Sequence, residues 1–324
     1  MNQVIRFHAN GGPEVLQLED IAPGQPGPGE VLLRHSAIGV NFIDTYHRTG
    51  LYPLTLPSGL GSEAAGVVEA VGEGVDYLAV GDRVAYAGGA QGAYSQRRVM
   101  NAAPLVKLPD DIGDDTAACV MLQGMTVEYL IRRTYAVQPG QTVLWHAAAG
   151  GVGQIAVQWL NSLGVHVIGT VGSADKADIA RRLGCRQVIN YREEDVVARV
   201  NQITDGKGVP VVYDSVGKDT FEISLNCLMP RGMFVSFGNA SGAVPAFAPL
   251  LLAQKGSLYF TRPRLGDYVA TRAELEASAA ALFERIRAGA VKVQPSARYA
   301  LADAARAHAD LEARRTTGSI ILQP

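Results

Sequence analysis

Residues 143–153, which read VLWHAAAGGVG, constrain the fold more than any other part of the chain. A short apolar run enters a turn of small residues, and an amphipathic run, QIAVQWLNSLG, leaves it. This order predicts a strand, a tight turn and a helix. Gly150 and Gly153 stand where a dinucleotide fingerprint has its second and third glycines, and Ala148 takes the place of the first. Glycines needed only for a tight turn would look the same, so the flanking strand and helix carry the prediction of a pyrophosphate site at a helix N-terminus.

The strand predicted at residues 166–171 leads into a segment that bears on the choice of cofactor. In NAD-binding units the second strand ends in an Asp or Glu that binds the ribose 2′-hydroxyl. Here no acid stands at the strand tip, and Gly172, Ser173 and Lys176 follow. A hydroxyl and an ammonium would bind a 2′-phosphate, which a carboxylate would repel, so we expect NADPH. In the alternative, Asp175 is the ribose acid slightly displaced, or Lys176 is a solvated residue opening the next helix.

Length and composition exclude several classes of protein. With 324 residues, 48% of them hydrophobic and 19% charged, the chain is long enough for two domains with sizeable cores. Lys and Arg (29) nearly balance Asp and Glu (31), and no basic tract occurs, so nucleic acid is not an expected partner. No apolar run reaches the roughly 18 residues that span a membrane, and no targeting peptide precedes the first strand. The cysteines, at 119, 185 and 227, are odd in number and far apart, which favours a cytoplasmic protein without disulfides.

The predicted elements divide the chain into a β-rich part and an alternating part. Strands at 4–7, 15–20, 30–38, 61–71 and 82–87 suit a small barrel. A helical segment at 115–136 leads into strands at 142–145, 166–171, 187–190, 209–214, 233–237 and 257–260, with helices between them, which is the count of a doubly wound sheet. A helix at 271–288 opens with a capping box at Thr271 and Glu274. A strand within 291–299, a helix at 301–313 and a strand at 319–322 are expected to return to the first domain.

Seven runs of residues resemble the medium-chain dehydrogenase/reductase superfamily, and the resemblance covers essentially the whole chain. They are FHANGGPEVL (7–16), NFIDTY (41–46), GLYP (50–53), GLGSEAAG (59–66), HAAAGGVG (146–153), VYDSVG (212–217) and SFGN (236–239). Within the superfamily the chain is similar to the zinc-free, NADPH-dependent quinone oxidoreductases of the zeta-crystallin-like branch. The resemblance implies an α/β protein with a GroES-like β-barrel catalytic domain (1–122 and 266–324) and a doubly wound Rossmann NADPH-binding domain (123–265). It also implies a homodimer that pairs the sixth strands.

The positions of zinc ligands in the superfamily are occupied by other residues here. Zinc-dependent members hold a catalytic zinc with a cysteine, the histidine of a Gly-His-Glu run and a second cysteine. This sequence has Asn41 and Ser62 at the first two positions, and no cysteine within 121–124. Its six histidines and three cysteines show no metal-ligand spacing, so we expect no metal. Without a Lewis acid to stabilise an alkoxide, the expected acceptor is a quinone or an enone, which spreads the incoming charge over its own π-system.

Catalytic residues are assigned by the resemblance. It places Asn41, Tyr46 and Tyr52 in a loop-rich stretch after a barrel strand, lining the cleft between the domains beside the nicotinamide. Asn41 or a tyrosine hydroxyl would hydrogen-bond the acceptor oxygen or the ribose. A tyrosine could also donate a proton, although a phenol with a pKa of about 10 is a poor acid at neutral pH. For each tyrosine the alternative is a packing role, as for Tyr52 directly before Pro53.

Cofactor residues are expected at the C-terminal ends of the strands, which form the ligand-binding edge of such sheets. The pyrophosphate is assigned to Gly150, Gly151, Val152 and Gly153, and the adenosine phosphate to Gly172, Ser173 and Lys176, with Tyr191 at the adenosine end. Strand ends that could fix the carboxamide supply Ser215, Phe237, Gly238, Asn239 and Leu265. Thr126 and Tyr129 are assigned to the nicotinamide half, and Phe42 is also expected to contact the cofactor. Arg314 joins the adenosine end by resemblance only, a solvated helix-end arginine being the alternative, and we interpret His146 as structural.

Other functions stay open at this stage. A related zinc-free reductase would reduce the C=C bond of enals or enones, with Tyr46 or Tyr52 protonating the α-carbon. A non-catalytic role is also known in this branch, as a lens crystallin or in RNA binding, but the balanced charge and the phosphate site argue against it. The expected partners are a small-molecule quinone or conjugated carbonyl and a second copy of the chain.

Overall fold

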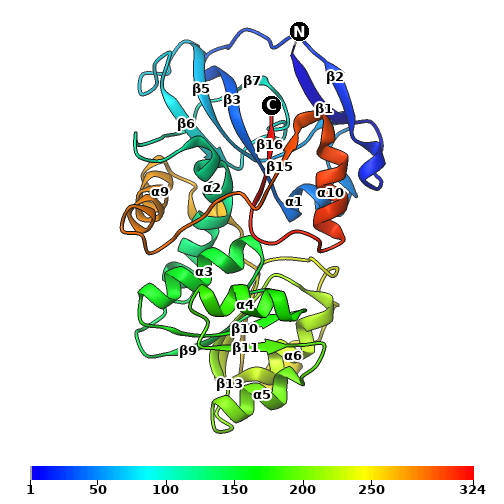
Figure 1. Ribbon diagram of the computed structural model, residues 1–324, viewed down its shortest axis with the longest axis vertical. Helices are drawn as coiled ribbons and strands as arrows, with labels where there is room; N and C mark the ends of the chain where they lie inside the picture. Colours follow the sequence, from blue (N-terminus) through cyan, green and yellow to red (C-terminus); the bar gives the residue numbers. More distant parts are fainter. Residues whose placement is uncertain (1) are drawn as a thin grey trace. The chain divides into compact units, whose positions relative to one another are not determined.

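The computed structural model describes residues 2–324 and divides into two compact units (Figure 1). Unit 1 comprises Met1–Met125, Tyr268–Arg287 and Val293–Pro324, and unit 2 comprises Thr126–Asp267 and Ala288–Lys292. Residues 288–292 group with unit 2, although the sequence analysis assigned them to the barrel domain. The reason is a reciprocal contact, in which the Gln158 side chain accepts the backbone N–H of Lys292 (2.9 Å) and donates to its carbonyl (3.2 Å).

Unit 2 contains a parallel sheet with strand order β11–β10–β9–β12–β13–β14. Its strands are β9 (Thr142–Trp145), β10 (His166–Val171), β11 (Gln187–Asn190), β12 (Val209–Asp214), β13 (Leu228–Ser236) and β14 (Tyr259–Thr261). The connecting helices are α3 (Gly151–Ser162), α4 (Ala174–Arg182), α5 (Val196–Ile203), α6 (Phe221–Cys227) and α7 (Leu250–Gln254). The predicted doubly wound sheet is confirmed, although β13 begins at Leu228 rather than at 233.

Both faces of this sheet are buried, as a parallel sheet with helical crossovers requires. Leu144 and Ile168 pack on one face in the same cluster as Phe221 of α6 and Val200 of α5. Figure 1 shows α3 and α4 on the opposite side of the strands from α5 and α6. Trp159 of α3 is fully buried there. Because helices cover both faces of the sheet, we expect ligands of this unit to bind at the strand ends.

Unit 1 is built around two sheets, which are antiparallel except for the parallel pair β15–β16 in the larger one. The larger has the order β15–β16–β3–β5–β6–β8, with β7 also paired to β3, and the smaller has the order β2–β1–β4. The strands are β1 (Gln3–Phe7), β2 (Gln17–Asp20), β3 (Glu30–Val40), β4 (Ser58–Gly59), β5 (Glu63–Val71), β6 (Arg83–Ala87), β7 (Arg97–Asn101), β8 (Val106–Lys107), β15 (Ala297–Ala300) and β16 (Ile320–Gln323). Since β16 pairs with β3, the end of the chain returns to the first unit as predicted.

Unit 1 contains helices as well as strands. They are α1 (Phe42–Arg48), α2 (Asp114–Tyr129), which crosses into unit 2, α9 (Arg272–Arg287) and α10 (Ala304–Glu312). A π-helical turn, Leu130–Thr134, follows α2, and the short α8 (Leu265–Tyr268) precedes α9. No helix within residues 2–324 is both long and apolar enough to cross a lipid bilayer.

Three sequence predictions need correction in unit 1. The stretch expected to be loop-rich after residue 40 contains α1, whose start is stabilised by the Asp44 carboxylate accepting the backbone N–H of Asn41 (2.8 Å). The strand expected from residue 15 begins at Gln17, because Pro13–Val15 form a 3₁₀ turn. The strand expected within 291–299 is confined to Ala297–Ala300, where β16 offers a partner.

The predicted capping box of α9 is present and gives a test of local stability. The Thr271 backbone N–H donates to the Glu274 carboxylate (3.0 Å), and the Glu274 N–H donates to the Thr271 hydroxyl (3.3 Å). We expect Thr271→Ala to lower the free energy of unfolding by about 1 kcal/mol, because an orphan helix donor loses its acceptor. Urea unfolding of this variant should be compared with Thr271→Ser, which keeps the hydroxyl. An equal loss in both variants would show that the cap contributes nothing.

Candidate active site

The glycine turn of unit 2 has the geometry that the sequence predicts. Gly150 is the N-cap of α3, in extended conformation, so that the N–H groups of the first helical turn have no acceptor within the helix. A side chain on Gly153 would overlap the carbonyl oxygen of Ala147 and the backbone of Ala148. Ala148 itself is fully buried and donates its N–H to the Thr170 carbonyl (3.1 Å). The turn therefore presents backbone donors at the C-terminal edge of the sheet, which is a geometry suited to an anion.

The residues predicted for the adenosine phosphate lie together beyond β10 and β11. The Tyr191 hydroxyl lies so close to Gly172 that a side chain at Gly172 would overlap it. Ser173 is the N-cap of α4, and its hydroxyl accepts the backbone N–H of Lys176 (3.4 Å). Lys176 thus lies in the first turn of a helix whose N-terminus favours an anion. Ser173 has a structural role that the sequence analysis did not assign, in addition to the predicted one.

The C-terminal ends of β12 and β13 bring together most of the residues that were predicted to fix the carboxamide. Asp214, rather than Ser215, ends β12, and its carboxylate accepts the N–H groups of Val216 (2.8 Å) and Gly217 (3.0 Å). The Phe237 N–H donates to the Asp214 carbonyl (2.8 Å), and Gly238 packs directly against Ser215. Ser215 and the Phe237–Asn239 run are therefore neighbours at the edge that carries the glycine turn, whereas Leu265 lies in α8, beyond the strand ends.

His146 supports this edge from inside. Its ring nitrogens pair with the hydroxyls of Thr170 (2.9 Å) and Ser224 (3.1 Å), and Ser224 in turn donates to Asp214 (2.7 Å). The side chain is buried, and burial lowers the pKa of the imidazole. Such an arrangement fits the structural interpretation of His146.

Asn41, predicted to be catalytic, is held by its neighbours in unit 1. Its amide nitrogen donates to Glu63 Oε2 (2.6 Å), and its amide oxygen accepts from Gln123 Nε2 (3.0 Å). Gln123 is fixed in turn by the Ser319 hydroxyl of the C-terminal segment (2.8 Å). Asn41 is only 6% exposed, so its amide primarily ties β5, α2 and the start of α1 together.

Glu63 is a buried carboxylate that the sequence analysis did not select. Its Oε1 accepts the backbone N–H of Leu122, in the interior of α2 (2.7 Å), so the side chain enters the hydrogen-bond ladder of that helix. Burial raises its pKa to about 8, against the lowering effect of the hydrogen bonds from Asn41 and Leu122. Asp44, also fully buried, adds to this rise, and burial raises the pKa of Asp44 itself to about 7. The sequence feature that could have identified Glu63 is its place as the one acid of the otherwise apolar run EAAGVV, which it opens.

The side chains of Tyr46 and Tyr52, both predicted to be catalytic, contact each other. Their rings pack edge to face with centroids 5.4 Å apart, and the Tyr52 N–H donates to the Tyr46 carbonyl (3.0 Å). Tyr46 lies on α1 and is 8% exposed, while Tyr52 lies in the following loop and is half-buried. Phe42 opens the same helix.

The remaining predicted residues are divided between the units. Thr126 and Tyr129 lie in the last turns of α2 and belong to unit 2. Arg314 follows α10 in unit 1, in the left-handed backbone conformation (φ 58°). Tyr129 is buried, whereas Arg314 is exposed.

Ser62 and Asn41, which the sequence analysis placed at the positions of zinc ligands, are each hydrogen-bonded to another protein side chain. The Ser62 hydroxyl accepts a hydrogen bond from Gln91 (2.9 Å), and Asn41 is bonded to Glu63. Across residues 2–324, no group of three or more His, Cys, Asp or Glu side chains is arranged to hold a metal ion.

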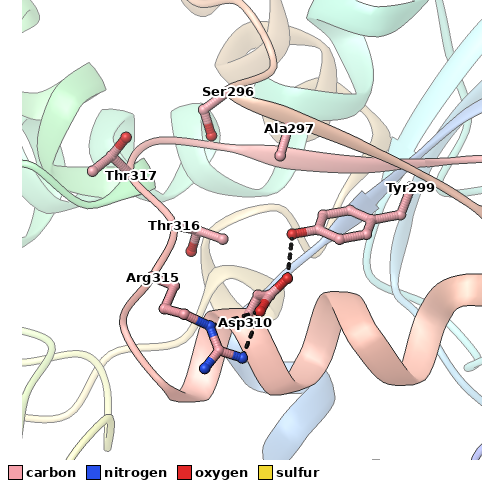
Figure 2. A pocket seen from close by; sticks show the side chains of 7 residues that line it. All are labelled: Ser296, Ala297, Tyr299, Asp310, Arg315, Thr316 and Thr317. Carbon is pink, nitrogen blue, oxygen red and sulfur yellow. Dashed lines mark hydrogen bonds and ion pairs between the residues drawn. The ribbon is translucent and has the colours of Figure 1, made fainter.

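Cavities occur away from these residues. One of about 270 Å³ lies in unit 1, where Figure 2 shows the Tyr299 hydroxyl and the Arg315 guanidinium meeting at the Asp310 carboxylate (2.9 and 2.8 Å). Because Asp310 balances the charge of Arg315 within this cavity, it offers no net charge to a ligand. Another, of about 430 Å³, lies at the N-terminal ends of β9–β11, the edge opposite the glycine turn. None of the predicted site residues lines either cavity.

Comparisons with known proteins cover both units. The alcohol dehydrogenase GroES-like domain family matches residues 27–110, and the zinc-binding dehydrogenase family matches residues 151–283. A quinone oxidoreductase of Pseudomonas aeruginosa is 57% identical over 325 residues, covering 100% of both chains. The crystal structure of Escherichia coli quinone oxidoreductase complexed with NADPH matches with a TM-score of 0.98 at 53% identity, covering 99% of this chain and 100% of that one. A 2-haloacrylate reductase of a Burkholderia species is 48% identical, with 98% of each chain covered.

The buried Glu63 predicts a pH dependence of stability. Because its folded pKa, about 8, lies above the ordinary value of 4.5, its contribution is fully present below pH 4.5 and is lost as the pH rises through 8. We expect Glu63→Gln to remove on the order of 1–2 kcal/mol of the decline in unfolding free energy between pH 6 and 8. Urea unfolding at both pH values measures it, with Glu69→Gln on the same strand as a control for losing a carboxylate. A decline identical in wild type and Glu63→Gln would disprove the assignment.

Proposed function

The chain belongs to the NADPH-dependent quinone oxidoreductases of the medium-chain dehydrogenase/reductase superfamily, and from that premise we infer that it reduces quinones with NADPH. The observation that carries this function is full-length identity above 50% to a quinone oxidoreductase whose structure contains NADPH. The protein is an oxidoreductase, and NADPH is its cofactor.

The residues of unit 2 fit this cofactor. The turn at Gly150–Gly153 leaves room for a pyrophosphate, and no carboxylate at the end of β10 opposes a 2′-phosphate. We propose that Ser173 and Lys176 bind that phosphate and that Tyr191 contacts the adenosine. When bound, NADPH supplies a hydride, and the chain has to orient the carboxamide, for which Ser215 and Phe237–Asn239 are the proposed residues. Thr126, Tyr129, Phe42, Leu265 and Arg314 remain proposed cofactor contacts.

On the acceptor side we propose Tyr46 and Tyr52 as the residues that bind the quinone oxygen. A hydride received at one end of a quinone leaves negative charge on an oxygen, which a hydroxyl donor stabilises. Asn41 lies next to α1, and its amide is bonded at both ends to protein groups. We therefore propose that Asn41 contributes by fixing the start of the helix that carries Tyr46.

The reaction is proposed to need no metal, and the site is proposed to work as part of a homodimer. Zinc independence is supported by the side chains at positions 41 and 62, which bind Glu63 and Gln91. For the dimer, β14 is the last strand of its sheet, and Tyr259 on it is 60% exposed. Pairing of two β14 strands would cover this edge. A cytoplasmic location is supported by the three cysteines, which are free and buried.

A second candidate is reduction of the C=C bond of a conjugated carboxylic or carbonyl compound. The 48% identity to a 2-haloacrylate reductase over nearly the full length favours it. The hydride would go to the β-carbon, and Tyr46 or Tyr52 would protonate the α-carbon. Quinone reduction remains the first candidate because the relatives with higher identity are quinone oxidoreductases.

The two candidates predict different products. Under anaerobic conditions, with a chelator present, we expect the purified protein to oxidise NADPH with 1,4-benzoquinone and to form hydroquinone in equal amount. With 2-chloroacrylate or an enone we expect turnover at least tenfold slower. Product analysis by chromatography decides between them, and rapid saturation of the C=C bond would make the second candidate the function. Loss of quinone turnover on chelation, restored by zinc, would refute the metal-free proposal.

Lys176 gives a test of the cofactor site. We expect Lys176→Ala to weaken NADPH binding by about ten- to a hundredfold, since one charge-assisted hydrogen bond is worth roughly 1.5–3 kcal/mol, and to leave NADH binding nearly unchanged. Arg182→Ala removes a positive charge from the last turn of the same helix and controls for the general field. Fluorescence titration with both cofactors measures the effect. Equal weakening for NADPH and NADH would show that Lys176 does not bind the 2′-phosphate.

A further inference from the structure

Helix α1 is tied to the C-terminal helix α10 by a ring of buried hydrogen bonds. Asp44 and Arg48 lie one turn apart on α1, and both are at most 1% exposed. The Tyr94 hydroxyl donates to Asp44 Oδ2 (2.9 Å) and pairs with His308 Nε2 of α10 (3.0 Å). Arg48 Nη1 pairs with His308 Nδ1 (3.0 Å), and the backbone of α1 between Asp44 and Arg48 closes the ring. Every side chain of the ring is buried, so water cannot replace a lost partner at low cost.

The hydrogen bonds of this ring run in one direction. Arg48 has only donors, so His308 Nδ1 accepts, and Nε2–H is then the donor to the Tyr94 oxygen. Burial, reinforced by the charge of Arg48, lowers the pKa of His308 to about 3, which keeps its imidazole neutral as this pattern requires. The Tyr94 O–H is left to donate to Asp44. The hydrogen bonds therefore run from the Arg48 guanidinium to the Asp44 carboxylate through two neutral side chains, His308 and Tyr94.

Two further charged groups, Glu312 and Glu63, and one backbone carbonyl face the ring. Glu312 of α10 accepts from Arg48 Nη2 (2.6 Å), and the Arg48 Nε donates to the Gly11 carbonyl (3.1 Å). Glu63 of β5 lies close enough to Asp44 for the two carboxylates to repel each other. Asp44 Oδ1 has no hydrogen-bond partner, although it is buried. Asp44 therefore depends on Tyr94 and on the Asn41 N–H for its solvation, and it is the member of the ring that is most sensitive to loss of a donor.

Helix α1 needs this support because seven residues do not form a stable helix alone. It begins after Asn41 and carries Tyr46, against which Tyr52 packs. We propose that Tyr94 and His308 are positioning residues for quinone reduction, which hold α1 in the register that places Tyr46. The inference rests on the proposed function of Tyr46. Neither Tyr94 nor His308 is a catalytic residue in this proposal.

The same unit offers a matched control. Tyr86 pairs with His35 Nε2 (3.0 Å), and His35 Nδ1 pairs with the Ser95 carbonyl (2.7 Å). Tyr86 and Tyr94 are both 0% exposed, and burial lowers the pKa of His35 to about 4, as it does for His308. None of the hydrogen bonds of the Tyr86 hydroxyl reaches α1. Removing either hydroxyl therefore costs comparable stability, but only one of them belongs to the ring.

The test compares Tyr94→Phe with Tyr86→Phe. We expect similar losses in Tm, but a roughly tenfold fall in kcat for benzoquinone in Tyr94→Phe and less than a twofold change in Tyr86→Phe, with the KM for NADPH unchanged in both. Hydrogen exchange over residues 42–48 should be faster in Tyr94→Phe only. Equal kcat in the two variants, or a fall in kcat without faster exchange, would overturn the proposal.

His308 supplies the rescue experiment. Gln carries an acceptor and a donor that can replace Nδ1 and Nε2, so we expect His308→Gln to keep most of kcat and slow exchange over 42–48, and His308→Leu to lose both. Identical behaviour of the two variants would overturn the proposal. If the wild-type protein did not reduce quinones, the proposed function would fail, while the exchange rates of all four variants would still decide whether the ring holds α1.

Discussion

Two carboxylates buried beside Asn41 determine how unit 1 is organised. Removing Glu63 and Asp44 from water is costly unless donors surround them, and the only cation of the ring, Arg48, reaches Asp44 through two neutral side chains. The donors come instead from the Asn41 amide, the Asn41 and Leu122 backbones, and Tyr94. These groups belong to different segments of the chain, so satisfying two acids brings β5, α1 and α2 together.

This arrangement differs from that of zinc-dependent members of the superfamily at the same positions. A metal ion would supply the positive charge that holds its ligands together. Here Asn41, in the place of the first cysteine, donates one N–H to Glu63 and accepts from Gln123, and Ser319 supports Gln123 from the C-terminal segment. Side-chain amides thus link these segments through hydrogen bonds. The sequence shows the loss of the ligands, but only the structure shows what connects the segments in their absence.

How far the sequence predicts the protein depends on whether a site is built from backbone or from distant side chains. In unit 2 the site consists of strand ends and a glycine turn, so local periodicity was sufficient to locate β9, β10, β11 and β12 and the turn at 150–153. In unit 1 the decisive contacts join residues far apart in the chain, such as Arg48 with His308. No local pattern encodes such a pairing. The start of α1 was predictable from Asn41 and Asp44, whose spacing matches a helix cap, but the cap was overlooked.

The burial of so many ionisable groups determines how uniquely α1 is positioned rather than how stable the fold is. Apolar side chains in place of Asp44, Arg48, His308 and Tyr94 would avoid their desolvation, and in other proteins such replacement is often neutral or stabilising. What an apolar cluster would lack is direction, because Arg48 donates to His308, His308 donates to Tyr94, and Tyr94 donates to Asp44. A helix as short as α1 could rotate or slide on an apolar surface at little cost, whereas a shift of α1 here would leave a buried guanidinium and a buried carboxylate unpaired. We infer that the ring serves to hold α1, and with it Tyr46, in one position, at some cost in stability.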